Sequence, residues 1–129
     1  MVAAVNEKAD TRRATGASGE ELAAAWLTRR GWTVLARNWR CRSGELDIIA
    51  RDPGGALVAC EVKTRRGLGF GDPLESITHV KLRRLRDLVC EWRQAQEEAV
   101  GYVRLDAIGV LIDADGRPRL RHLRNLEQR

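Results

Sequence analysis

A short turn between two strand-like segments places the tightest constraint on how this chain can fold. Residues 45–50 read ELDIIA, residues 56–64 read ALVACEVKT, and the tetrapeptide DPGG at 52–55 separates them. Both segments are rich in aliphatic and β-branched residues, and Pro and Gly are typical of turns. A connection this short joins neighbouring antiparallel strands, so we expect a β-hairpin here.

Charged residues interrupt the apolar pattern of this hairpin. Alternation puts Glu45, Asp47 and Ile49 on one face of the first strand, and Glu61 and Lys63 on one face of the second. Antiparallel pairing is then expected to bring Asp47 and Glu61 close together. Two adjacent carboxylates repel unless one is protonated or a cation lies between them. Oxygen ligands suit Mg²⁺ or Mn²⁺, so the pair indicates a metal site.

Lys63 lies next to that expected metal site. The chain contains 20 arginines but only Lys8, Lys63 and Lys81, so a lysine at position 63 suggests a need for a compact ammonium. Such a group would stabilise negative charge or help to ionise a water molecule. A simpler alternative stays open, in which Glu61 and Lys63 pair with each other or with neighbours at a sheet edge.

The remaining segments complete an α/β pattern. A capping box of Ser18 and Glu21 starts a helix that Gly31 ends. Glu20 opens the apolar stripe of this helix, where it either interacts with the helix dipole or reaches toward a cation. Further elements are predicted as a strand over 32–39, a helix from Thr78, and strands over 102–112 and 118–123. The order α-β-β-β-α-β-β predicts a mixed sheet flanked by helices.

Composition narrows the class of protein. The chain has 129 residues, and we expect a polar arm over residues 1–16 and one domain over 17–126. A net charge of +5 favours a polyanionic partner. No apolar run is long enough to cross a membrane, and the first residues lack a secretory signal, so a cytoplasmic location is expected. The cysteines are widely spaced and no histidine is near one in the sequence, which argues against zinc.

These motifs together resemble a known family. Glu20, the GELD run containing Asp47, and EVK containing Glu61 and Lys63 are similar to the PD-(D/E)xK nuclease superfamily. A closer resemblance, over about residues 17–125, is to the YraN-like family of small bacterial proteins. It is carried by segments that match at Gly19–Gly31, Asn38–Asp52, Leu57–Arg65 and Thr78–Leu85. A leading Pro-Asp dipeptide is absent here, where Leu46 precedes Asp47.

The resemblance implies a restriction-endonuclease-like core similar to that of Holliday-junction resolvases. It implies that Asp47 and Glu61 are metal ligands, that Lys63 is the catalytic lysine and that Glu20 is an accessory acid. Glu45, Thr64, Arg65 and Lys81 also occupy motif positions, near substrate phosphates or around the metal ligands. Contacts with nucleic-acid phosphates are expected from a basic set comprising Arg40, Arg42, Arg65, Arg66, Lys81 and Arg84.

Three functions remain open on sequence grounds. The first is a Mg²⁺- or Mn²⁺-dependent endonuclease that hydrolyses DNA phosphodiesters, on branched or damaged DNA, with DNA expected over RNA. Chemistry on a two-fold junction would need a homodimer. The second is a nucleic-acid-binding protein of the same fold that does not cut, or cuts only with a partner. The third is a protein-interaction module that uses the Trp and Leu faces, although the four tryptophans are expected to be core anchors.

Overall fold

The computed structural model describes residues 3–4, 18–67, 74 and 77–128, which form a mixed α/β fold. The elements in chain order are β1 (Ala3–Ala4), α2 (Gly19–Arg29), β2 (Thr33–Cys41), β3 (Gly44–Arg51), β4 (Leu57–Arg66), α3 (His79–Gln94), β5 (Val103–Ile112), β6 (Pro118–Leu123) and the 3₁₀ helix η2 (Leu126–Gln128). The predicted order α-β-β-β-α-β-β is confirmed for residues 18–123. Apart from β1, the expected arm over 1–16 lies outside the described residues.

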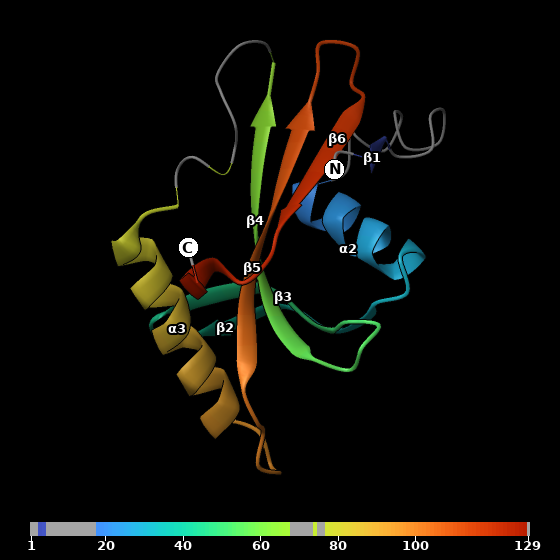
Figure 1. The fold of residues 1–129 in the computed structure, drawn as a ribbon. Helices are drawn as coiled ribbons and strands as arrows, with labels where there is room; N and C mark the ends of the chain where they lie inside the picture. The colour runs from blue at the N-terminus through green and yellow to red at the C-terminus, as the bar shows by residue number, and fades with distance from the viewer. Residues whose placement is uncertain (1–2, 5–17, 68–73, 75–76, 129) are drawn as a thin grey trace.

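The strands form one six-stranded sheet in the order β1-β6-β5-β4-β3-β2 (Figure 1). The pair β4–β5 is parallel, whereas the other neighbouring strands are antiparallel. Parallel neighbours cannot be joined by a tight turn, and the chain between them includes α3. The predicted hairpin of β3 and β4 is confirmed, with Ile48 opposite Cys60 and Arg51 opposite Leu57.

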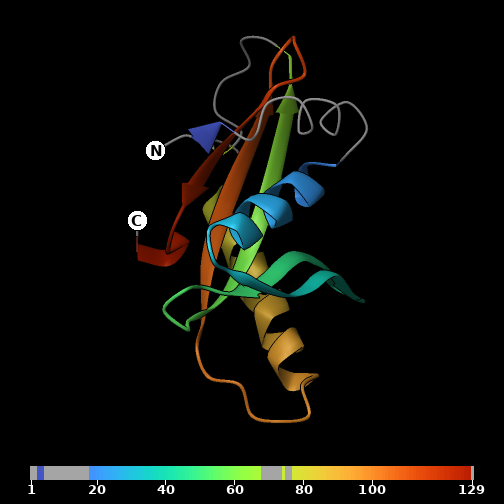
Figure 2. The same cartoon turned by 90° about the vertical axis from the view of Figure 1, so that its right-hand side faces the viewer.

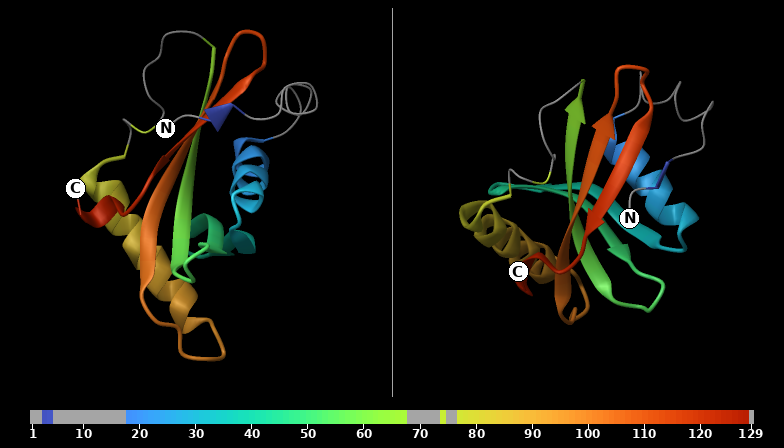
Figure 3. Two further views of the ribbon diagram at one scale, coloured as in Figure 1. Left: turned by 45° about the vertical axis from the view of Figure 1, so that its right-hand side comes forward. Right: turned by 45° about the horizontal axis from the view of Figure 1, so that its top comes forward.

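Two hydrophobic clusters hold the helices against opposite faces of the sheet (Figure 3). Leu22 and Leu27 of α2 pack with Ile48, Val58 and Ile108 on one face. On the other face, the α3 side chains pack against strand residues, and this cluster includes Leu88, Val89, Trp92, Ile49, Ala59 and Leu105. Trp26, Trp32 and Trp92 are buried and Trp39 is half-buried, as expected of core anchors. Within the described residues, neither helix is long and apolar enough to span a bilayer.

The start of α2 presses directly against β4. The predicted capping box is present, with Ser18 Oγ accepting from Glu21 N at 3.1 Å and Glu21 Oε1 accepting from Ser18 N at 3.1 Å. A Cβ atom added to Gly19 would lie 1.8 Å from Thr64 Oγ1 and 3.0 Å from Thr64 Cβ. Only a residue without a side chain allows this approach, which brings the first turn of α2 to the β3–β4 hairpin.

The prediction that side chains alternate strictly between the two faces of β3 is wrong at Leu46. We expected Leu46 and Ile48 on one face and Ile49 on the other, but Leu46 packs in the α3-side cluster together with Ile49. The change coincides with Asn38 in the partner strand β2, whose φ of 53° interrupts regular β backbone. Pairing flanks that residue, with Arg37 opposite Ile48 and Trp39 opposite Leu46.

We predict that Gly19→Ala destabilises the protein although alanine is the better helix former. The added methyl group meets Thr64, so we expect a loss of about 1–3 kcal/mol, typical of overpacking. The measurement is the urea midpoint of Gly19→Ala alone and combined with Thr64→Ala, which removes the nearest atom. A gain in stability for the single variant would show that the helix and strand are not in close contact.

Candidate metal centre and nucleic-acid interface

Asp47 stands where β3 separates from β4. The ladder between these strands covers Ile48 to Arg51 of β3, and at the next position Asp47 Oδ2 accepts the backbone N–H of Val62 at 2.8 Å. A side-chain carboxylate thus takes the place of a backbone acceptor. Beyond this point β3 stays paired with β2, and Figure 2 shows the β2–β3 hairpin extending away from β4.

Glu61 and Lys63 line the β4 side of this separation. Asp47 lies close enough to Glu61 to raise its pKa, so the expected proximity of the two acids is present. Burial raises the pKa of Glu61 to about 7, and the adjacent Asp47 carboxylate adds to the increase while Lys63 opposes it. Lys63 Nζ lies 3.3 Å from Glu61 Oε2, so the simpler alternative of an ion pair between Glu61 and Lys63 is also present.

Glu20 and Glu45 complete the acid cluster, which comprises Glu20, Glu45, Asp47 and Glu61. Carboxylate oxygens of Glu20, Glu45 and Asp47 all lie within 4.8 Å of one another. Burial raises the pKa of Glu20 to about 7, with further contributions from Asp47, and Arg37 acts in the opposite direction. Glu45 is the acid that sequence reasoning left without a defined role, although the GELD run contained the signal.

The acid cluster offers only oxygen donors, from four carboxylates on α2, β3 and β4. Such a donor set fits a hard divalent cation such as Mg²⁺, Mn²⁺ or Ca²⁺ and does not favour Zn²⁺. Burial raises the pKa values of Glu20 and Glu61 most, and the adjacent Asp47 carboxylate raises them further; a cation there would remove the repulsion from Asp47. The residues present therefore fit the divalent cation that the sequence predicts.

The predicted phosphate-binding residues fall into two regions. Arg40, Arg42 and Arg84 gather at the tip of the β2–β3 hairpin, where an Arg84 nitrogen lies 3.0 Å from the Cβ position of Gly44. Arg40 is 78% exposed and its Nε lies 2.6 Å from Glu45 Oε2, so it borders the acid cluster. Lys81 is exposed in the first turn of α3.

The other region is the end of β4, where Arg65 and Arg66 are both exposed but belong to opposite faces. The α2-side cluster includes Cys60 and Val62, so alternation puts Arg66 on the α2 side. Arg65 shares the α3-side face with Lys63. The structure therefore brings Arg65, and not Arg66, into line with the proposed catalytic lysine.

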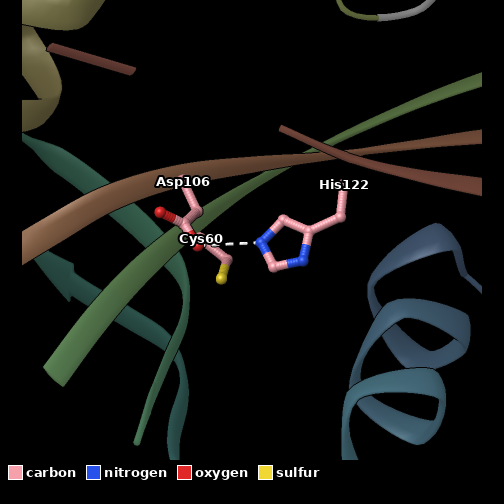
Figure 4. Close-up of side chains that lie close together, drawn as sticks. All are labelled: Cys60, Asp106 and His122. Carbon is pink, nitrogen blue, oxygen red and sulfur yellow. Dashed lines mark hydrogen bonds and ion pairs between the residues drawn. The ribbon is translucent and has the colours of Figure 1, made fainter. Parts of the chain in front are cut away.

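A second polar cluster lies under α2 and comprises Cys60, Asp106 and His122 (Figure 4). The sequence separates these residues widely, yet one ligand atom from each lies within 4.8 Å of the others. The fold thus brings a histidine beside a cysteine that lies far from it in the sequence, so distance along the chain does not by itself exclude a metal site here. His122 Nε2 lies 2.8 Å from Asp106 Oδ2, and Asp106 is fully buried.

The contacts of Asp106 indicate a structural network in place of a metal site. Its carboxylate accepts two hydrogen bonds from Arg104, at 2.8 and 2.9 Å, and one from the N–H of Asn125 at 3.0 Å, in addition to the His122 contact. Burial acts to raise the pKa of Asp106, but these hydrogen bonds outweigh it and hold the pKa at about 2. Arg104 also bridges to Asp52 at 3.3 Å. With its oxygens occupied and a guanidinium alongside, Asp106 is a poor ligand for a further cation.

We predict that Glu61→Gln stabilises the protein at pH 8 when divalent cations are removed with EDTA. Raised pKa values mean that the folded state holds protons that the unfolded state has released, so stability falls as pH rises from about 4.5 through about 7. Removing one charge should restore about 1–2 kcal/mol after discounting for remaining solvent contact. Urea midpoints at pH 5 and pH 8 measure this effect, with the exposed Glu98→Gln as control. A lower midpoint for Glu61→Gln at pH 8 would contradict it.

We predict that Asp106→Asn strongly destabilises the protein and that a zinc chelator has no effect on the wild type. The substitution leaves Arg104 and His122 facing a neutral amide, and breaking a buried charge pair typically costs about 3–5 kcal/mol. The exposed turn residue Asp115, changed to Asn, should alter the urea midpoint little. A chelator that lowers the wild-type midpoint would instead point to a bound metal.

Comparison with known proteins identifies the family. The model of "Uncharacterised protein family UPF0102" matches residues 19–110. A UPF0102 protein of Acidothermus cellulolyticus is 51% identical over 126 residues, covering 90% of this chain and 95% of the relative. A UPF0102 protein of Nocardia farcinica is 48% identical over 113 residues, covering 88% of each chain.

The solved structure of Pyrococcus furiosus SfsA in complex with Ca²⁺ is a weak structural match. Its TM-score is 0.37 at 16% identity, over 88% of this chain and 64% of the SfsA chain, which is too low to support a conclusion about this protein. The family match spans most of the chain, which therefore belongs to the uncharacterised protein family UPF0102.

Proposed function

We propose that this protein is a metal-dependent endonuclease that hydrolyses DNA phosphodiester bonds. The observation that carries the proposal is the convergence of Asp47, Glu61, Lys63 and Glu20 where β3 leaves β4. That constellation supports the YraN-like assignment, a restriction-endonuclease-like core and membership of the PD-(D/E)xK superfamily. The same residue types in the same order carry the resemblance in the sequence.

Asp47 and Glu61 would hold Mg²⁺ or Mn²⁺, with Glu20 and Glu45 near enough to contribute directly or through water. When bound, such a cation offsets negative charge on a phosphate and lowers the pKa of a coordinated water. The carboxylate of Asp47 is fixed by its hydrogen bond from Val62, so one ligand is preorganised by the backbone of β4. Glu20 adds a carboxyl group that can accept or release a proton near neutral pH.

Lys63 supplies the positive charge for the reacting phosphate. Its Nζ is held 3.3 Å from Glu61 and its side chain is 27% exposed, so it faces the site and remains accessible. An ammonium at this place would stabilise charge that develops on phosphate oxygens during attack by water. A guanidinium is larger and donates in a fixed plane, so arginine would not replace it well.

The basic set would bind the nucleic-acid backbone without reading sequence. Arg40 pairs with Glu45 of the acid cluster, Arg42 and Arg84 lie at the hairpin tip, Lys81 is exposed in the first turn of α3, and Arg65 follows Lys63 on the same face of β4. Arg66 would have to reach a phosphate around the end of β4. A branched or damaged DNA remains the proposed substrate, with two copies of the chain acting on a two-fold junction.

We predict that the purified protein cleaves DNA with Mg²⁺ or Mn²⁺ and that Asp47→Asn and Lys63→Arg each lower the rate at least about 100-fold. Asp47→Asn keeps the size of the side chain, and Lys63→Arg keeps the charge, so both losses report on chemistry. The measurement is the cleavage of labelled junctions, flaps and nicked duplexes, followed on gels with EDTA as the metal-free control.

The matched control is Asp115→Asn, an equivalent change on an exposed turn, which should cleave at the wild-type rate. Urea midpoints confirm that each variant is folded. Cleavage at the wild-type rate by both the Asp47→Asn and the Lys63→Arg variants would refute the mechanism. Salt-sensitive binding that survives Asp47→Asn, with no cleavage of any substrate, would favour the alternative of a non-catalytic or partner-dependent nucleic-acid-binding protein.

A further inference from the structure

We propose that the face of β4, β5 and β6 that carries Lys63 and the exposed side chains of Arg65, Arg119 and Arg121 is a binding surface for the phosphate backbone of a double-stranded nucleic acid, with Arg119 and Arg121 as its outer contacts. This β4–β6 platform is defined by Lys63, Arg65, Arg119 and Arg121. The sequence analysis did not assign Arg119 or Arg121 any role. The inference rests on the proposed nuclease function and names the form of its substrate.

The strand register puts these four side chains on one face. Lys63 is opposite Gly109 and Gly109 is opposite Arg121, so the three residues form one row across the sheet. The next row consists of Arg65, Leu111 and Arg119. Neighbouring strands lie about 4.8 Å apart, which separates the ends of each row by roughly 10 Å. Gly109 is buried and has no side chain, so Lys63 and Arg121 supply the side chains of this row.

The two rows contain four cations and no acid. Arg65, Arg119 and Arg121 are exposed, Leu111 is half-buried, and Lys63 is paired with Glu61 at the border of the platform. The next acid toward the β5–β6 turn is Asp113, whose Oδ1 accepts the N–H groups of Asp115 and Arg117, each at 2.9 Å. The platform therefore concentrates positive charge where a polyanion would bind.

The platform is continuous with the proposed catalytic residues. Toward the acid cluster, the preceding row consists of Glu61, Ala107 and Leu123, so Glu61 and Lys63 lie at its border. The basic tip of the β2–β3 hairpin lies on the other side of the acids, and Figure 2 shows the hairpin diverging from the long strands. A backbone that crosses from the hairpin tip to the platform passes the acid cluster.

The side chains of the platform favour a duplex over a single strand. Proteins that bind single strands stack bases on aromatic side chains, whereas duplex backbones are bound by cations alone. Among the described residues, no aromatic side chain belongs to either row. The exposed Tyr102 precedes β5 at the opposite end of that strand, with its hydroxyl near Glu127. The platform thus fits the charge of a duplex, and its described residues offer no stacking surface for a single strand.

The test compares Arg119→Glu with Arg51→Glu, which changes the net charge equally at the other end of the sheet. Arg51 is opposite Leu57, next to the β3–β4 turn, and its guanidinium donates a hydrogen bond to the nearby Gly55 carbonyl at 2.8 Å. Binding of a labelled 30-base-pair duplex and of the same single strand is measured by anisotropy in EDTA, at several salt concentrations. We expect Arg119→Glu to weaken duplex binding about tenfold or more at 0.1 M salt. We also expect the slope of the log binding constant against log salt concentration (the salt slope) to fall by the value of about one phosphate contact.

Arg51→Glu should weaken binding only slightly, and Arg119→Ala combined with Arg121→Ala should lower the salt slope by about two contacts. Equal effects of Arg119→Glu and Arg51→Glu, no effect of Arg119→Glu, or tighter binding of the single strand would overturn the inference. Failure of the nuclease proposal is seen separately. If Arg119→Glu still cleaves DNA with an unchanged KM, the platform proposal is refuted and the nuclease proposal stands. If binding depends on the platform but no DNA is cleaved, the nuclease proposal is refuted and the platform proposal stands.

Discussion

The hydrogen bond from Val62 N–H to the Asp47 carboxylate is the interaction on which the site depends. It satisfies a β4 donor at the point where the backbone ladder with β3 stops, so the strands can separate without leaving that group unpaired. It also fixes the carboxylate beside Glu61. One contact therefore ends the regular hairpin and orients the residue that would bind the metal.

Close packing of α2 brings a second element to the same place. Because Gly19 has no side chain, the first turn of the helix meets Thr64 of β4, and Glu20 follows at once in the sequence. The positive end of the helix dipole favours an acid there, yet burial and Asp47 act more strongly and raise the pKa of Glu20. The fold holds these acids together against their repulsion, as expected of a site completed by a cation.

The two polar clusters of the molecule show how partner number decides the role of a buried acid. Asp106 receives hydrogen bonds from Arg104, His122 and the backbone of Asn125, and its pKa falls to about 2. Burial raises the pKa of Glu61 to about 7, the adjacent Asp47 adds to the increase, and Lys63 opposes it. The first arrangement is complete without an ion. The second becomes electrostatically balanced when a divalent cation is added.

The sequence by itself determined the order of helices and strands between residues 18 and 123, the β3–β4 hairpin and the proximity of Asp47 to Glu61. These features depend on local signals: capping residues, a short turn and side-chain alternation. Only the tertiary structure decided the rest, because contacts between distant segments leave no local pattern. It brought Glu45 and Glu20 together, joined Cys60 with Asp106 and His122, and aligned Arg119 and Arg121 with Lys63 through strand pairing. It also placed Leu46 on the α3 side, next to a part of β2 where the backbone is irregular at Asn38.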